Sequence, residues 1–135
     1  SQAVAINSKN YLSHFNLGFA KYNLNDFISA IESYDRAIEL KPDYSKAHSN
    51  KGGALKQLNR LNDAIDSYEV AIQCDPNSVT DYANLATLLI ERNEVHTALD
   101  ICDKGITIDP FFSELYFVKG NTLQKIKKNL VQMER

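Results

Sequence analysis

Hydrophobic residues recur with helical spacing in three similar stretches of the chain. In AIESYDRAIEL (30–40) the apolar residues fall three or four positions apart, as on one side of an amphipathic helix. IDSYEVAI (65–72) and LDICDKGI (99–106) repeat this stripe. A proline follows each stretch and ends the predicted helix, because proline lacks an N–H donor and disfavours helix at the preceding residue. Polar pairs typical of a loop or helix N-cap come before the stretches: Asn25-Asp26, Asn62-Asp63 and Asn93-Glu94.

The pattern has a fixed period of 34 residues, because the prolines are Pro42, Pro76 and Pro110. A period of this length is typical of a repeat protein. We call residues that are one period apart a column. One column holds small residues before the predicted turn: Gly18, Gly52, Ala86 and Gly120. Two more lie in the second helix: Ala30, Ala64 and Ala98, and Tyr34, Tyr68 and Cys102. The small residues predict that the two helices of each unit cross closely.

These columns resemble the tetratricopeptide repeat, in which L-G, A-x3-Y and a proline recur every 34 residues. The matching residues are Leu17-Gly18, Ala30, Tyr34, Ala37 and Pro42, then Gly52, Ala64, Tyr68, Ala71 and Pro76, then Leu85-Ala86, Ala98, Gly105 and Pro110. The resemblance implies an all-α, right-handed solenoid of antiparallel helix pairs. We expect a single domain with repeats at 11–44, 45–78 and 79–112, and a partial repeat or capping helix at 113–135.

The N-terminal residues 1–10 match the end of a second helix, since Ala3 and Ile6 stand one period before Ala37 and Leu40. We interpret them as the end of a preceding repeat or as an N-terminal segment. At the other end, the first helix of a fourth unit is expected to run from Ser113 to about Lys125. The lysine-rich stretch after it is interpreted as a solubilising cap.

Composition narrows the function. The chain has 135 residues, is 44% hydrophobic and 24% charged, and carries a net charge of −2, which argues against a general nucleic-acid binder. No apolar run approaches the roughly 18 residues that a membrane span needs. Cys74 and Cys102 lack metal-site or disulfide spacing, so we interpret them as buried thiols of an intracellular, cytoplasmic protein.

The sequence shows no motif for catalysis, phosphate binding or metal binding. We therefore expect no enzymatic activity and no cofactor. His14 and His48 share a column, but no third ligand follows the period, so they are interpreted as buried packing residues. Lys51 and Lys119 occupy the column of Leu17 and Leu85, which predicts looser helix packing at those two positions.

The resemblance implies that first helices line a concave groove where extended peptides bind. Helical spacing puts these residues on the face that the packing columns leave free: Phe15, Asn16, Phe19, Tyr22, Lys46, Asn50, Lys56, Asn84 and Thr87. Asn16, Asn50 and Asn84 form one column, and a carboxamide matches both the N–H and the C=O of a peptide backbone. The alternative is that each asparagine bonds a neighbouring helix and stiffens the solenoid.

The aromatic side chains of Phe15, Phe19 and Tyr22 predict an apolar docking pocket, or else packing against upstream residues. Lys46 and Lys56 would attract acidic or polar side chains. The asparagine column resembles the ladder in the superhelix of O-linked N-acetylglucosamine transferase and that of peroxisomal targeting-signal receptors. A chaperone-type clamp for two carboxylates is disfavoured, because Asn50 alone among its five positions fits.

We therefore predict a protein-interaction module for a protein or peptide partner, without nucleic acid or membrane insertion. Two alternatives stay open: a scaffold subunit of a multiprotein complex, and the substrate-recognition segment of a larger enzyme such as a glycosyltransferase. The sequence leaves the oligomeric state undecided.

Overall fold

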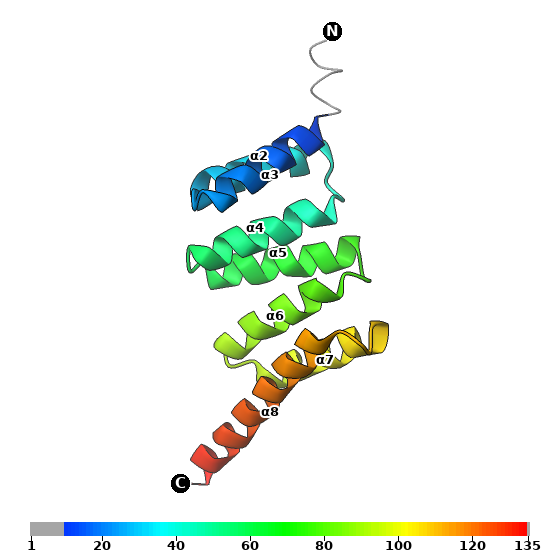
Figure 1. Cartoon of the computed structure of the whole chain (residues 1–135). Helices are drawn as coiled ribbons and strands as arrows, with labels where there is room; N and C mark the ends of the chain where they lie inside the picture. The colour runs from blue at the N-terminus through cyan, green and yellow to red at the C-terminus, as the bar shows by residue number, and fades with distance from the viewer. Residues whose placement is uncertain (1–9, 135) are drawn as a thin grey trace. The chain divides into compact units, whose positions relative to one another are not determined.

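Seven α-helices and no strand make up residues 10–134, the part of the chain that the computed structural model describes (Figure 1). The helices are α2 (Tyr11–Asn23), α3 (Phe27–Leu40), α4 (Ser45–Gln57), α5 (Leu61–Cys74), α6 (Val79–Glu91), α7 (Val95–Ile108) and α8 (Ser113–Met133). The predicted all-α fold is confirmed. The interpretation of Ala3 and Ile6 lies outside the described residues.

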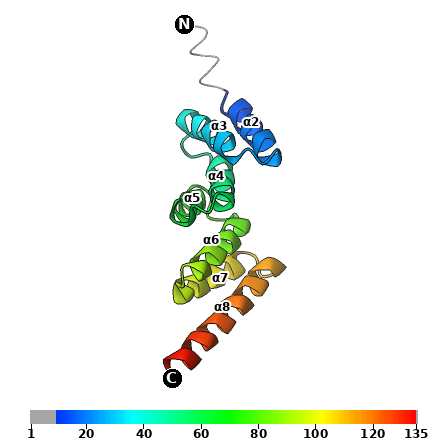
Figure 2. The same cartoon turned by 90° about the vertical axis from the view of Figure 1, so that its left-hand side faces the viewer.

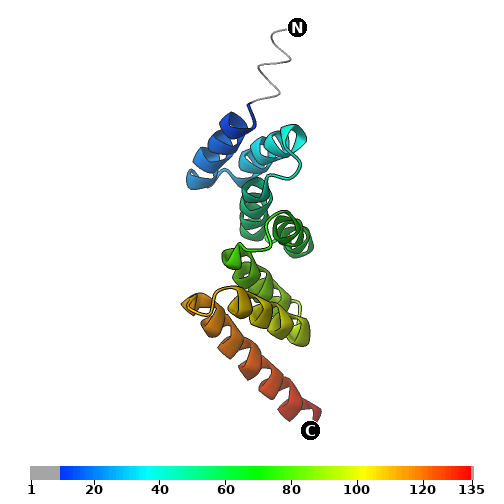
Figure 3. The same ribbon diagram turned by 90° about the vertical axis from the view of Figure 1, so that its right-hand side faces the viewer.

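The chain divides into two compact units, unit 1 (Ser1–Asp75) and unit 2 (Pro76–Arg135). In unit 1, α2 packs against α3, α4 packs against α5, and α3 also contacts α4 (Figure 2). In unit 2, α6 packs against α7, and α8 contacts both of them (Figure 3). None of the helices in residues 10–134 is long and apolar enough to cross a membrane.

The predicted close crossings are confirmed in unit 1. A Cβ atom on Gly18 would lie 2.7 Å from Cε1 of Tyr34, and one on Gly52 would lie 3.0 Å from the Tyr68 ring. A Cβ atom would therefore crowd the aromatic ring that the second helix presents at both positions. In unit 2 the same columns hold Ala86 and Cys102, and both are fully buried. A smaller side chain on one helix is thus matched by a larger one on the other.

The turns between paired helices use an asparagine in the left-handed conformation. Asn25, Asn59 and Asn93 have φ values of 62°, 60° and 62°. Asn tolerates this region because its short polar side chain can hydrogen-bond locally. The predicted loop pair Asn62-Asp63 is wrong, because α5 already begins at Leu61. The residue one period after Asn25 is Asn59, so the prediction placed this turn three residues too late.

The last helix differs from its predecessors because it has no such turn. The residue one period after Asn93 is Lys127, and α8 continues through it to Met133. The prediction that a first helix ends at about Lys125 is therefore wrong. Lysine carries a Cβ penalty in the left-handed region and is a good helix former, so nothing at this position interrupts the helix.

Ion pairs join consecutive helices where looser packing was predicted. The Lys51 ammonium lies 2.7 Å from the Asp35 carboxylate, which links α4 to α3. Two periods later, Lys119 lies 2.8 Å from Asp103 and links α8 to α7. A lysine in this column can therefore take part in helix packing through an ion pair. The prediction overlooked these acidic partners, although they too stand two periods apart.

Hydrogen bonds to the proline carbonyls fix the start of three first helices. Nε2 of His48 lies 2.8 Å from the carbonyl oxygen of Pro42. Tyr82 and Tyr116 donate equivalent 2.8 Å bonds to the prolines six residues before them. His14 and His48 are half-buried rather than buried, so the interpretation of both as buried packing residues is wrong. A polar side chain suits position 48, because its ring nitrogen contacts the backbone carbonyl of Pro42.

Candidate peptide-binding surface

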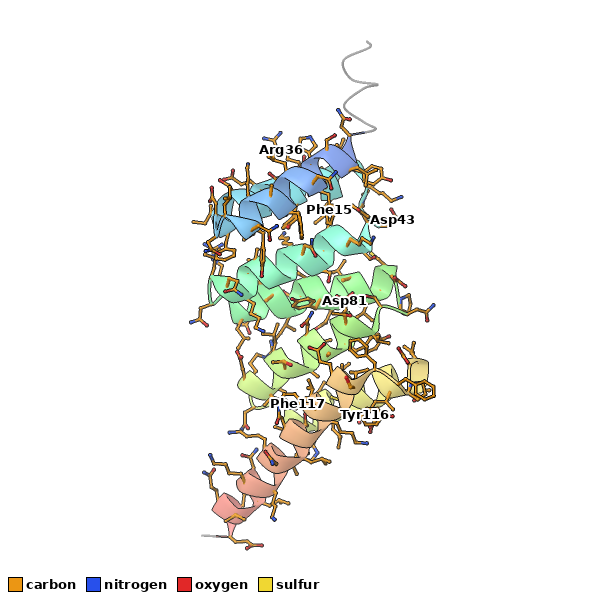
Figure 4. The ribbon with its side chains drawn as sticks, in the orientation of Figure 1. Phe15, Arg36, Asp43, Asp81, Tyr116 and Phe117 are labelled. Carbon is orange, nitrogen blue, oxygen red and sulfur yellow. The ribbon has the colours of Figure 1, made fainter. Side chains whose placement is uncertain are left out.

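The aromatic residues of α2 are placed differently from one another. Phe15 packs against Tyr44 and Tyr34, with ring centroids 5.2 and 5.8 Å apart, and Figure 4 shows it between α2 and α4. Tyr22 packs against Phe27 at 5.1 Å. Both rings therefore have neighbours within unit 1, where the sequence left a docking pocket and packing against upstream residues as alternatives. Both rings pack inside unit 1 and leave Phe19, which is 52% exposed, as the accessible aromatic of the three.

The three asparagines of the column share one property. They lie one period apart on the first helices α2, α4 and α6. Asn16 on α2 is exposed, whereas Asn50 on α4 and Asn84 on α6 are half-buried. Buried and half-buried carboxamides normally find partners, because an unmet donor or acceptor is costly. Within unit 1, the Asn50 carboxamide acts on the Tyr34 hydroxyl of α3.

A buried hydroxyl lies beside Asn50. Tyr34 is fully buried, and its hydroxyl has no hydrogen-bond partner of acceptable geometry. Burial raises the pKa of Tyr34, while the nearby Asn50 carboxamide acts in the opposite direction and the Tyr22 phenol raises it further. The sequence analysis did not single out this hydroxyl, because the Tyr34 column was interpreted only as packing.

The remaining predicted residues are two lysines on α4 and a threonine on α6. Lys46 and Lys56 are exposed on α4. In unit 2, Thr87 is half-buried and donates its hydroxyl to the Ala83 carbonyl at 2.9 Å, one turn back in its own helix. Val118, one period after Asn84, is buried. An apolar residue suits this position, because it belongs to the core of unit 2.

Unit 1 also carries two hollows that sequence reasoning missed. One, of about 390 Å³, lies where α3, α4 and α5 meet and contains the Asp35–Lys51 ion pair together with Arg60, Asp63 and Asp66. The other, of about 190 Å³, is lined by five residues of α2 and α3: His14, Lys21, Glu32, Ser33 and Arg36. In the latter, Lys21 donates to the buried Ser33 hydroxyl at 3.3 Å. Both have mixed charge, and residues 10–134 contain no group of three or more side chains suited to a metal ion.

Three family models match the chain, each described as tetratricopeptide repeat. They match residues 11–44, 45–78 and 67–100, which together span residues 11–100. No curated protein matches the chain.

Solved structures share the fold. The TPR2B domain of yeast Sti1, solved as a pHsp70 complex, is 25% identical with a TM-score of 0.77, covering 89% of this chain and 98% of that one. The first TPR of Spaghetti (RPAP3), bound to the HSP90 peptide SRMEEVD, is 14% identical with a TM-score of 0.83, covering 89% and 95%. The Sgt2 TPR domain from Aspergillus fumigatus is 19% identical with a TM-score of 0.82, covering 90% and 82%.

Proposed function

We propose that this chain, which belongs to the tetratricopeptide repeat family, binds an extended peptide segment of a partner protein along its first helices. The observation that carries the proposal is the asparagine column on the first helices. The carboxamide of Asn16 is exposed on α2, and those of Asn50 and Asn84 are half-buried on α4 and α6. An extended peptide backbone offers the N–H and C=O groups that would satisfy them.

In unit 1 the proposed contacts come from α2 and α4. Asn16 and Asn50 would bond the peptide backbone, and Phe19 would cover an apolar side chain. Lys46 and Lys56 would attract acidic or polar residues, because both ammonium groups lie in solvent. Phe15 and Tyr22 would hold this surface rigid through their ring contacts rather than bind the peptide themselves. In unit 2, Asn84 and Thr87 would supply further polar contacts.

The solved complexes with chaperone peptides support a peptide ligand but leave its identity open. Yeast Sti1 and Spaghetti were solved with pHsp70 and with an HSP90 peptide. In this chain, two of the positions that would hold a carboxylate clamp are Phe15 and Phe19, and Phe15 packs against Tyr34 and Tyr44. We therefore propose a ligand held mainly through its backbone, in the manner of the asparagine ladder of O-linked N-acetylglucosamine transferase.

A display library of random peptides provides the test, with binding of the selected peptides measured by fluorescence polarisation. Affinities should be about micromolar, because ordering an extended peptide costs entropy. Asn50→Ala and Asn16→Ala should each weaken binding about fivefold, the equivalent of a hydrogen bond of about 1 kcal/mol. Gln73→Ala removes an exposed carboxamide from the second helix α5 and is the matched control.

The labelled peptide SRMEEVD tests the ligand class in the same assay. It should bind no more tightly than a scrambled peptide. The reason is that Phe15 and Phe19 stand at the positions where a carboxylate clamp has a lysine and an asparagine. Binding that is unchanged in an Asn16→Ala, Asn50→Ala double variant would exclude the carboxamide role.

A further inference from the structure

One side of α8 lacks the cover that the equivalent side of every earlier first helix has. Gly18 and Gly52 lie under the rings of Tyr34 and Tyr68, and Ala86 in the same column is fully buried. Gly120 continues this column, but a Cβ atom built on it would meet no atom within 4 Å. The position that elsewhere receives a second helix is therefore open.

Large apolar side chains line the same side of α8. Tyr116, Leu123 and Leu130 are 48%, 47% and 55% exposed. They stand seven residues apart, so two helical turns separate each from the next on one side of the helix. Figure 2 shows the C-terminal part of α8 extending past the ends of α6 and α7, and Figure 4 labels Tyr116 near its start. We name Tyr116, Gly120, Leu123, Lys127 and Leu130 the outer stripe.

The charge of the outer stripe restricts what can cover it. Lys127 lies inside the stripe, four residues after Leu123 and three before Leu130, and it is exposed. Lys125 and Lys128 flank it, so this part of α8 is basic although the whole chain has a net charge of −2. A helix that covers the stripe needs carboxylates opposite these lysines. A second copy of α8 would instead bring lysines against lysines.

We propose that the outer stripe docks an amphipathic, acidic helix of a partner protein, with an aromatic or other large residue of that helix seated on Gly120. The proposal goes beyond peptide binding on the first helices, because it uses a different surface and a helical rather than an extended ligand. A lipid surface would also accept an exposed basic and apolar stripe. An open glycine, however, serves close helix packing and offers nothing to a membrane.

The chain contains a suitable probe in its own α3. Residues 26–40 form the second helix that covers Gly18 in unit 1, and they carry four acidic residues against one arginine: Asp26, Glu32, Asp35, Glu39 and Arg36. A labelled synthetic peptide of residues 26–40 is titrated with the 135-residue chain, and fluorescence polarisation reports binding. We expect weak but saturable binding, because an isolated helix of this length is only marginally stable in water.

Two variants of the stripe and two matched controls decide the result. Gly120→Leu blocks close approach without disturbing the unit, since no atom lies near that position, and should weaken binding at least about tenfold. Lys127→Glu should weaken it as well. Asn121→Leu and Lys128→Glu make the same chemical changes at exposed positions off the stripe and should have little effect.

Absent binding, or binding that Gly120→Leu leaves unchanged, would overturn the proposal. Analytical ultracentrifugation of the chain alone tests whether a second copy occupies the outer stripe. A dimer that Gly120→Leu dissociates would also overturn the proposal. Co-sedimentation with phosphatidylserine vesicles tests a membrane. Vesicle binding that Leu123→Ser abolishes, with no binding of the peptide, would likewise refute a helical partner.

Discussion

Two glycines of one column should respond to the same substitution in opposite directions. In Gly18→Ala the new Cβ would lie 2.7 Å from Cε1 of Tyr34 and 3.2 Å from the Ala30 carbonyl oxygen. The Tyr34 ring is fully buried, so it has no free space into which to move. Overpacking of this kind costs about 1–3 kcal/mol, and we expect the upper end because a backbone atom lies in the way as well.

Helix propensity offsets part of that cost, since alanine is favoured over glycine by about 0.5–1 kcal/mol. Gly18→Ala should therefore lower the free energy of unfolding by about 2 kcal/mol. Gly120→Ala meets no atom within 4 Å and keeps the whole propensity gain, so it should raise that free energy by about 0.5–1 kcal/mol. The two variants should thus differ by about 3 kcal/mol.

Urea unfolding followed by circular dichroism at the helical band measures both variants against the unchanged chain. At about 1–3 kcal/mol per molar urea, Gly18→Ala should shift its transition to lower urea by about 1 M. The unfolding curve is fitted with a separate transition for each of the two units. The shift for Gly18→Ala should appear in the transition of unit 1. If Gly18→Ala proves as stable as Gly120→Ala, the reasoning from the close contact with Tyr34 is refuted.

Three further predictions concern single hydrogen-bonding or backbone features. Tyr34→Phe removes an unpaired buried hydroxyl and should raise stability by up to about 1 kcal/mol. Because the pKa of Tyr34 is raised, the folded state keeps the Tyr34 proton above about pH 10, whereas the unfolded state loses it. The free energy of unfolding should therefore fall as the pH rises past that value, and it should fall less in Tyr34→Phe. Asn59→Ala should cost about 1 kcal/mol because φ is 60°, whereas Asn59→Gly should be near neutral; thermal unfolding of the pair separates backbone strain from side-chain loss. Tyr82→Phe removes the 2.8 Å bond to the Pro76 carbonyl and should cost about 1 kcal/mol in urea unfolding, and an unchanged midpoint would contradict a structural role for this bond.

The fold was largely predictable because close helix packing leaves a direct mark on the sequence. A Cβ atom on Gly18 or Gly52 would crowd the ring of Tyr34 or Tyr68, so the spacing of these residues reports a contact. The end of α8 was not predictable in this way. Each earlier turn depends on one asparagine with a positive φ, a conformation that the sequence does not display, and Lys127 stands in that column in α8.

The candidate surface was harder to predict, because helical spacing identifies a face but not what lies against it. Phe15 and Phe19 are four residues apart on one helix, yet Phe15 meets Tyr34 and Tyr44 while Phe19 remains exposed. Such contacts depend on side chains from other helices. The asparagine column was found because it is periodic. The exposure of Asn16 and the partial burial of Asn50 and Asn84 required the structure.

The turn column also bears on how readily this architecture changes by mutation. Lysine and asparagine codons differ only in their third base, so position 127 is a single nucleotide change away from the residue that turns the chain at Asn25, Asn59 and Asn93. Asparagine there would supply the turn but not the small residue that follows in the Ala30 column, where Gln132 stands. A single base substitution at position 127 would therefore supply one of the two residues that distinguish the earlier helix pairs from α8, and not the other.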